Sequence, residues 1–141
     1  MFIRLTDTVA VAGQLAPDDL VTAATAGFVA VVNNRPDAEE HGQPSGEAME
    51  TAAKAAGLTY TAIPIDHHGF DRTQVDAMAA VLDACAGPVL AFCRSGTRSA
   101  NLWALAEAQR GGDADTIIAA AARGRYDVSG LRPMLLALAA R

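Results

Sequence analysis

The sequence is poor in the residues that most often carry chemistry. Its 141 residues include only two cysteines, three histidines and one tryptophan, and Lys54 is the single lysine. Two cysteines are too few for a secreted disulfide scaffold, and the scarcity of Cys and His argues against a thiolate-rich or histidine-rich metal site. The chemistry must therefore depend on very few side chains, and we expect no metal and no other cofactor.

Length, charge and hydropathy exclude further classes. With 51% hydrophobic residues the chain is too apolar for a disordered protein, and its length suits one domain over residues 1–141. A formal net charge of −5 disfavours nucleic acid and anionic membranes as partners. The longest apolar stretches, such as residues 134–140, are far shorter than the roughly 20 residues that span a bilayer. No targeting segment is visible at the start, so we expect a soluble cytoplasmic protein.

Short apolar runs alternate with stretches of helical periodicity. The predicted strands are residues 2–5, 9–12, 28–32, 58–65 and 89–92. The predicted helices are residues 17–26, 47–56, 73–85 (with Thr73 as the cap), 99–110, 113–122 and 132–140. This alternation implies parallel crossovers and a three-layer α/β sandwich with a mainly parallel sheet. Ligands bind beyond the carboxyl ends of such strands, so the loops 33–46, 66–71 and 93–99 should meet there.

The most informative segment is Phe-Cys-Arg-Ser-Gly-Thr-Arg-Ser at residues 92–99, between a predicted buried strand and a helix. Backbone N–H groups in such a turn, with the positive end of the helix dipole, form a cradle for an anion. The same field stabilises a thiolate, so we predict a lowered pKa and a nucleophilic role for Cys93. Arg98 can hold an oxyanion through two nitrogens, and Ser99 could donate a hydrogen bond to the thiolate. The other predicted substrate-binding residues of this loop are Arg94, Ser95, Gly96 and Thr97.

A second predicted loop contains Asn34 and Arg35 at the same edge of the sheet. Arg35, with Asn34 beside it, could hold an anionic substrate, while the asparagine side chains fix the neighbouring backbone. The alternative is a purely structural turn in which Arg35 pairs with an acidic neighbour. The acidic neighbours are Asp37, Glu39 and Glu40.

The third loop contains two candidate general acids, Asp66 and Asp71. A carboxyl group at this edge could protonate the leaving group of a cysteine-dependent reaction. Between them, His67 and His68 are better explained as solvated loop residues than as metal ligands. Cys85 is separated from Cys93 by a strand, which places the two sulfurs roughly 15 Å apart, beyond disulfide reach, so we expect it to be a small core residue.

The loop itself resembles known active sites. The segment Cys-Arg-Ser-Gly-Thr-Arg-Ser at residues 93–99 resembles the active loop of single-domain rhodaneses, in which four residues follow the Cys before the Arg or another polar residue. It is also similar to the cysteine-phosphatase signature, which places five residues in that gap and usually a His before the Cys, where this chain has Phe92. A tighter loop suits a persulfide sulfur better than a full phosphate.

A wider resemblance covers nearly all of residues 1–110. Ala-Gly-Gln at residues 12–14, Val-Val-Asn-Asn-Arg-Pro-Asp at 31–37, and the segment from Tyr60 through Ile-Pro-Ile at 63–65 occur together in one family. This is the phosphatase-like domain of the β-lactamase-hydrolase-like proteins, also described as a sulfur transferase family. The resemblance implies a tyrosine-phosphatase-like fold of the dual-specificity type with a rhodanese-length loop. It also implies a persulfide dioxygenase-type partner, because some members are fused to such an enzyme.

On these grounds we favour the first of three functions, and the other two are alternatives. In the first, Cys93 is a sulfurtransferase nucleophile that takes sulfane sulfur from a small anionic donor, forms a persulfide and passes the sulfur on. In the second, the chain is a phosphatase that hydrolyses a phosphate ester through a Cys93 phosphothiolate, with Asp66 or Asp71 as the acid. In the third, it is a thiol sensor or anion-binding module for a sulfur-oxidising partner. The last predicted helix, 132–140, could cover the core or form a homodimer contact.

Overall fold

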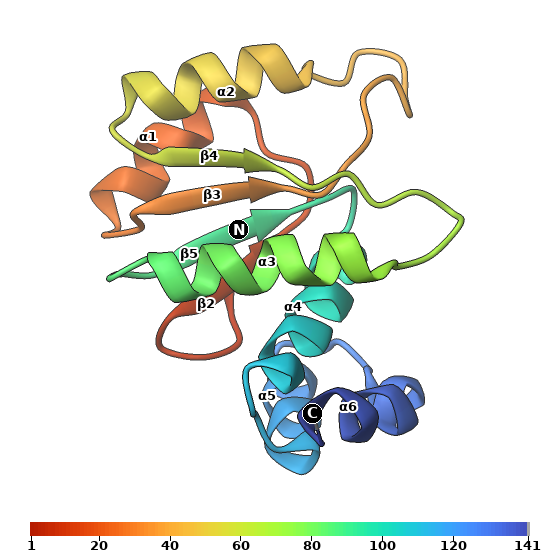
Figure 1. Ribbon diagram of the computed structural model, residues 1–141. Coiled ribbons are helices and arrows are strands. Elements are labelled where there is room, and N and C mark those ends of the chain that lie inside the picture. Colours follow the sequence, from red (N-terminus) through yellow and green to blue (C-terminus); the bar gives the residue numbers. More distant parts are fainter. Residues whose placement is uncertain (141) are drawn as a thin grey trace.

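The computed structural model describes residues 1–140, in which strands and helices alternate along the chain (Figure 1). The strands are β1 (Ile3–Arg4), β2 (Val9–Ala12), β3 (Ala30–Asn33), β4 (Thr59–Ala62) and β5 (Val89–Phe92). The helices are α1 (Pro17–Thr25), α2 (Gly46–Ala55), α3 (Arg72–Ala84), α4 (Thr97–Gln109), α5 (Ala114–Arg123) and α6 (Arg132–Ala139), with the short turn η1 (Ser129–Leu131) before α6.

The five strands form one sheet in the order β1-β2-β5-β3-β4. Strands β2, β5, β3 and β4 are parallel, and only β1 is antiparallel to its neighbour. The three inner strands are buried along their whole length, which is why their sequences are nearly continuous apolar runs. Because β5 lies between β2 and β3, the residue that follows β5 lies between the loops that follow its two neighbours. That residue is Cys93.

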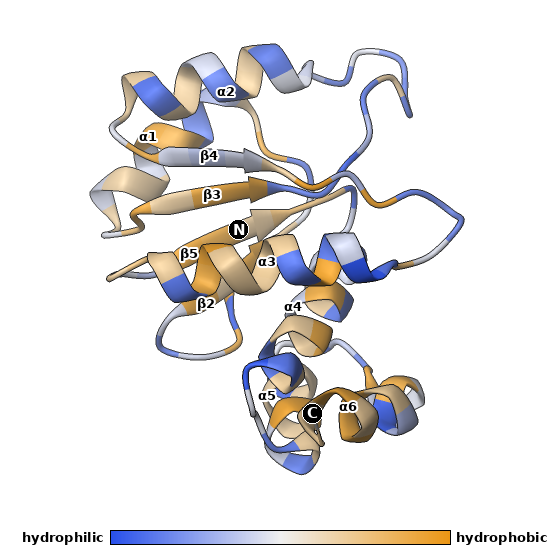
Figure 2. Cartoon of the chain, in the orientation of Figure 1, coloured by the Kyte–Doolittle hydropathy of each residue, from blue (hydrophilic) through white to orange (hydrophobic). Residues whose placement is uncertain are grey.

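Alternate side chains of the inner strands enter two separate cores. On one face, residues such as Val31 and Leu90 pack with Leu20 of α1 and Met49 of α2. On the other face, Val32 and Ala91 belong to a core that includes Met78 of α3 and Trp103 of α4. The predicted three-layer α/β sandwich with a mainly parallel sheet is therefore confirmed. Figure 2 shows β3 as apolar along most of its length and hydrophilic at its carboxyl end, where the strand finishes with Asn33.

Several predicted ends are shifted by one to three residues, and two of these shifts have a clear local reason. The strand predicted to run to Ile65 ends at Ala62, because the regular pairing with β3 stops there. The N–H of Ile63 donates to the carbonyl of Asn33, and that of Ile65 donates to the next residue, Asn34, where a regular ladder would advance by two residues. These two bonds keep the chain beside the sheet beyond the end of β4. The cap of α3 is Asp71 and not Thr73, because the Asp71 carboxylate accepts from the backbone N–H of Gln74 and the Gln74 side chain accepts from that of Asp71.

The last two helices cover α4 at one end of the molecule (Figure 1). Ile117 and Ala121 of α5 and Leu135 of α6 are buried against it. On the outer side of α6, Met134 and Leu136 remain exposed. Within residues 1–140, no helix has both the length and the apolar character that crossing a membrane requires.

Candidate active site

Cys93 stands directly after β5, at the centre of the carboxyl edge of the sheet. Its side chain is buried, and its backbone N–H donates to the carbonyl of Ala12 at 3.3 Å. The chain then turns through Gly96, which has a φ of 90°, and enters α4. The Gly96 N–H donates to Cys93 Sγ at 3.1 Å. A hydrogen bond of this kind favours the thiolate over the thiol, so the turn suits a nucleophilic sulfur.

The loop also supplies free backbone donors around the sulfur. Within residues 1–140 no protein acceptor pairs with the backbone N–H groups of Arg94, Ser95, Thr97, Arg98 and Ser99. Three of these groups belong to the first turn of α4, where the helix dipole carries partial positive charge. Free amides and a helix N-terminus next to a cysteine are the parts of the anion cradle predicted from the sequence.

Arg98 is held in place by a carboxylate from another loop. Its Nη1 and Nη2 donate to the two oxygens of Glu39 at 2.7 and 2.9 Å, and Nη1 also donates to the carbonyl of Ile65 at 2.8 Å. The bonds from Arg98, and then those from Arg35, lower the pKa of Glu39 to about 2. The pKa of Arg98 is raised, chiefly by Glu39 and also by Cys93. Loops 33–46 and 93–99 therefore meet as predicted, and Arg98 also contacts Ile65, the residue directly before the third predicted loop, 66–71.

Arg35 has the structural role that we considered as the alternative. It is 4% exposed, and its Nε and Nη2 contact Glu39 and Glu40 at 2.8 and 3.2 Å. Its Nη1 donates to Gln14 Oε1 at 3.0 Å, so every side-chain nitrogen has an acceptor. Asp37 is not its partner, because that carboxylate accepts from the backbone of Gly46. Arg35 therefore orients Glu39, and Glu39 in turn holds Arg98.

Ser99 has a different partner from the one expected, whereas Asn34 fixes the neighbouring backbone as expected for the asparagine side chains. Both are fully buried, and Ser99 Oγ donates to Asn34 Oδ1 at 2.8 Å. The Asn34 side chain donates to the carbonyl of Ile63, and its backbone N–H donates to that of Phe92 at 2.8 Å. The hydroxyl of Ser99 thus gives its only proton to Asn34 and not to the Cys93 thiolate. Asn34, which is 0% exposed, thus joins Ile63, the residue after β4, to β5 and α4.

The remaining predicted loop residues form the exposed rim of the cradle. Arg94, Ser95 and Thr97 are exposed, and Ser95 Oγ donates to Thr97 Oγ1 at 3.1 Å. The Arg94 guanidinium lies 3.7 Å from Glu40, with two-thirds of its side chain in solvent. An exposed arginine at the rim can meet an incoming anion, whereas Arg98 is held by Glu39 and Ile65.

The two candidate general acids have different surroundings. Asp66 is exposed and follows Ile65, whose carbonyl binds Arg98, so it adjoins the site. Its carboxylate accepts from the backbone N–H of His68 at 2.8 Å, and hydrogen bonds from that residue lower the pKa of Asp66. Asp71 uses its carboxylate to cap α3.

Sequence reasoning missed Tyr126, which follows α5 and lies on the cysteine loop. Its Oη donates to the carbonyl of Ser95 at 3.1 Å. Burial and the neighbouring Cys93 raise the pKa of Tyr126. A Cβ built on Gly96 would lie 2.2 Å from the phenol oxygen, so the loop and the tyrosine fit only with glycine at this position. No motif spacing points to Tyr126; the one signal was that the chain has just two tyrosines.

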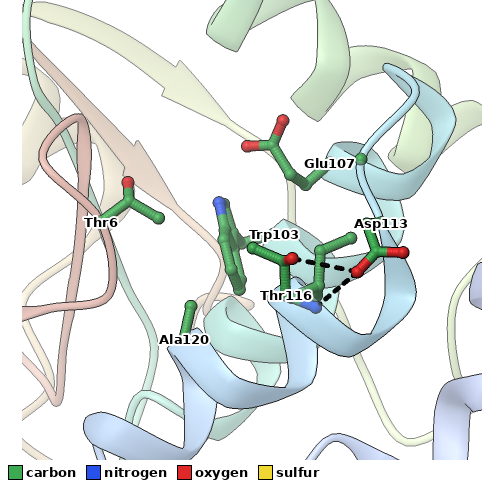
Figure 3. Close-up of a pocket in the computed structure, with 8 residues that line it drawn as sticks. Thr6, Trp103, Glu107, Asp113, Thr116 and Ala120 are labelled. Atoms are coloured by element: carbon green, nitrogen blue, oxygen red, sulfur yellow. Dashed lines mark hydrogen bonds between the residues drawn. The ribbon is translucent and has the colours of Figure 1, made fainter.

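A hollow lies away from the cysteine loop, between the β1–β2 turn and helices α4 and α5 (Figure 3). It has a volume of about 230 Å³ and is lined by Thr6, Trp103, Glu107 and residues of α5. The indole nitrogen of Trp103 has no acceptor within residues 1–140, but the atom is itself covered by protein. The two carboxylates beside this hollow are engaged elsewhere: Glu107 pairs with Arg110 at 2.9 Å, and Asp113 caps α5 through the N–H of Thr116.

The comparisons with known sequences agree on one family. Residues 2–110 match the family model described as "Beta-lactamase hydrolase-like protein, phosphatase-like domain". A beta-lactamase hydrolase-like protein of Agrobacterium fabrum (strain C58) is 35% identical over 109 residues, 77% of this chain and 25% of that protein. That of Xylella fastidiosa (strain Temecula1) is 33% identical over 105 residues, 74% of this chain and 24% of that protein. The chain therefore spans about a quarter of the length of these curated relatives.

Solved structures with the same fold carry phosphatase names. A candidate phosphatase of Neisseria meningitidis Z2491 superposes with a TM-score of 0.79 at 28% identity and covers 94% of both chains. Tk-PTP in its active form gives 0.75 at 21% identity, over 99% of this chain and 97% of that one. PTPMT1 gives 0.75 at 16% identity, over 100% and 98%. These last two show the fold alone, and the predicted cysteine-phosphatase-like architecture is confirmed.

Proposed function

Since the chain belongs to the phosphatase-like domain family of the beta-lactamase hydrolase-like proteins, we propose that it is a cysteine-dependent phosphatase that acts on phosphate monoesters. This reverses the order of preference that the loop spacing alone gave. The family model and the names of the solved relatives support phosphate chemistry, and neither mentions sulfur transfer. One observation carries the proposal: the Cys93 sulfur accepts a hydrogen bond from the Gly96 N–H and lies next to backbone N–H groups, unpaired within residues 1–140, at the N-terminus of α4.

The proposed reaction has two displacement steps at phosphorus. The Cys93 thiolate attacks the phosphorus, an S–P bond forms, and the bond between phosphorus and the ester oxygen breaks. The departing alkoxide takes a proton from a general acid and leaves as an alcohol. Water then attacks the phosphothiolate, which gives inorganic phosphate and restores the thiolate. The free loop amides are suited to the phosphoryl oxygens, on which the charge of the transition state is spread.

Asp66 is the better candidate for the general acid, because it adjoins the Arg98 site while Asp71 caps a helix. Because the pKa of Asp66 is lowered, its carboxyl group is ionised in most molecules at neutral pH. A general acid must be protonated, so acid catalysis should strengthen as the pH falls. We expect Asp66→Asn to slow hydrolysis of an alkyl phosphate by about tenfold or more and that of p-nitrophenyl phosphate much less, since nitrophenolate leaves without a proton. Equal effects on both substrates would remove Asp66 from this role.

Sulfur transfer is the second candidate, and the four-residue gap between Cys93 and Arg98 favours it. In that reaction the thiolate attacks the outer sulfur of thiosulfate and the S–S bond of thiosulfate breaks. Sulfite departs as the leaving group, and Cys93 becomes a persulfide. Cyanide or an acceptor thiolate then takes the outer sulfur and restores the thiolate. In the cell this chemistry would connect the chain with a persulfide dioxygenase-type partner. A third role, as a thiol sensor or anion-binding module, involves no turnover.

One set of assays separates the three functions. The wild type, Cys93→Ser and Cys85→Ser are compared for release of p-nitrophenol from its phosphate and for thiocyanate formation from thiosulfate and cyanide. Cys85 is the matched control because it is the only other thiol of the sequence and is partly buried against the core beside α3, away from the Cys93 loop. We expect phosphate turnover in the wild type and Cys85→Ser, and none in Cys93→Ser. Thiocyanate formation without phosphate release would establish sulfur transfer. If neither product forms, the third function, a thiol sensor or anion-binding module, is the one that remains.

A further inference from the structure

The peptide group between Ser95 and Gly96 is held from both sides. Its carbonyl accepts from Tyr126 Oη at 3.1 Å, and its N–H donates to Cys93 Sγ at 3.1 Å. In a planar trans peptide the C=O and N–H bonds point in opposite directions. A bond that fixes the carbonyl on the outer side of the loop therefore also directs the N–H at the sulfur.

The backbone of this peptide does not fix its own orientation. Gly96 has a φ of 90°, and glycine populates positive and negative φ about equally. The Ser95 side chain is exposed and bonds Thr97, so it does not hold the carbonyl. Among the described residues 1–140, the Ser95 carbonyl accepts from one donor, the Tyr126 hydroxyl.

Tyr126 is placed by helices that lie outside the segment matching the family model, which ends at residue 110. Helix α5 ends at Arg123, and the next turn passes through Arg125 at a φ of 71°. The Tyr126 N–H then donates to the carbonyl of Ala121 at 3.0 Å, and Val128, 1% exposed, anchors the chain beyond it. The turn therefore brings the phenol onto the cysteine loop in one defined position.

We propose that Tyr126 is a positioning residue for the nucleophile: by holding the Ser95 carbonyl, its hydroxyl keeps the Gly96 N–H on Cys93 Sγ and stabilises the thiolate. This rests on the proposed role of Cys93 as the nucleophile. The C-terminal helices thus contribute to the reaction centre and do more than cover α4. Without the hydroxyl, the peptide can rotate and the sulfur loses a donor that favours its charged form.

The test compares the two tyrosines of the chain by a conservative substitution. Tyr126→Phe and Tyr60→Phe are each made in a Cys85→Ser background, so that Cys93 is the only thiol. Tyr60 is the matched control because its hydroxyl also lies near the site, where it accepts from Asn33 at 3.0 Å, but it does not touch the cysteine loop. The readout is the pH midpoint at which the ultraviolet absorbance of the Cys93 thiolate appears, with the melting temperature as a check on folding.

We expect Tyr126→Phe to raise this midpoint by about one pH unit and Tyr60→Phe to leave it unchanged. Tyr126→Ala should give the same shift as Tyr126→Phe, because the hydroxyl and not the ring carries the effect. An unchanged midpoint in Tyr126→Phe, or a shift seen only in Tyr126→Ala, would overturn the proposal. The titration contains no substrate, so its outcome is separate from whether the chain hydrolyses phosphate esters or transfers sulfur.

Discussion

Two arginines from different loops meet at the carboxylate of Glu39. Arg35 follows β3 and Arg98 belongs to α4, and Glu39 accepts from both. Because both cations stabilise its charge, Glu39 keeps its negative charge down to a pH of about 2. The anion cradle therefore has a fixed guanidinium, oriented by an acid that the motif itself does not contain.

The first prediction concerns the removal of this charge. Glu39→Gln should reduce the unfolding free energy at pH 7 by about 1–2 kcal/mol and lower turnover by about tenfold, because Arg98 is no longer held. The folded pKa of about 2 lies below the unfolded value of about 4.3, so the stabilisation is present above pH ~4.3 and is lost as the pH falls toward 2. Urea unfolding of wild type and variant between pH 2 and pH 7 should show the two converging at low pH.

Glu50→Gln is the control for this prediction, because Glu50 pairs with Lys54 on the exposed side of α2 at 3.0 Å. An exposed pair of this kind contributes little. If Glu39→Gln cost no more stability than Glu50→Gln at pH 7, the assigned role of Glu39 would be wrong.

Single side chains show where the sequence is informative and where it is not. Cys93 and Gly96 were found because their roles depend on neighbours within a few residues along the chain. Arg35 binds Glu39 and Ser99 binds Asn34. For each of these two side chains, the sequence was compatible both with this structural partner and with a role at the substrate or the thiolate. Hydrogen bonds between distant residues are decided by packing, which no local pattern reports.

At the scale of elements, the strands were predictable because the inner ones are buried on both faces and read as apolar runs. The start of α3 was misplaced because Asp71 and Thr73 both suit a cap. The sequence offers each candidate a partner three residues later, Gln74 after Asp71 and Asp76 after Thr73. In the structure Gln74 completes the capping box, whereas Asp76 binds Arg72 and Gln109.

The second prediction separates capping from catalysis at Asp71. Asp71→Ala should lower the unfolding free energy by about 1 kcal/mol, while Asp71→Asn should stay close to wild type because Asn caps as well as Asp. Thermal unfolding measures both, and phosphatase turnover is recorded beside it. A stable Asp71→Asn protein without activity would show that Asp71 is the acid and contradict the role assigned here.

At the scale of the whole molecule, helices α5 and α6 were predicted, but their position on α4 and the delivery of Tyr126 were not. Their sequences are alanine-rich, so periodicity identifies an apolar face without identifying the surface that it covers. The homodimer contact suggested for the last helix stays a prediction. Its exposed residues Met134 and Leu136 would form that contact, and Leu135 is committed to the core.

The third prediction tests this docking with two neighbouring leucines. Leu135 is 0% exposed and Leu136 is 55% exposed. Leu135→Ala should cost about 2–5 kcal/mol of unfolding free energy, and Leu136→Ala about 0.5 kcal/mol or less. Similar costs for the two in urea unfolding would mean that α6 does not pack as described.

The central claim is that Cys93 attacks phosphorus, and the covalent intermediate tests it most directly. The protein is mixed with p-nitrophenyl phosphate, quenched within the first turnover and digested, and the peptide with Cys93 is weighed beside the same peptide after thiosulfate. We predict an increase of about 80 Da, the mass of one phosphoryl group, on Cys93 and on no other residue. The account is contradicted if the Cys93 peptide shows no increase after p-nitrophenyl phosphate but gains about 32 Da, the mass of one sulfur atom, after thiosulfate.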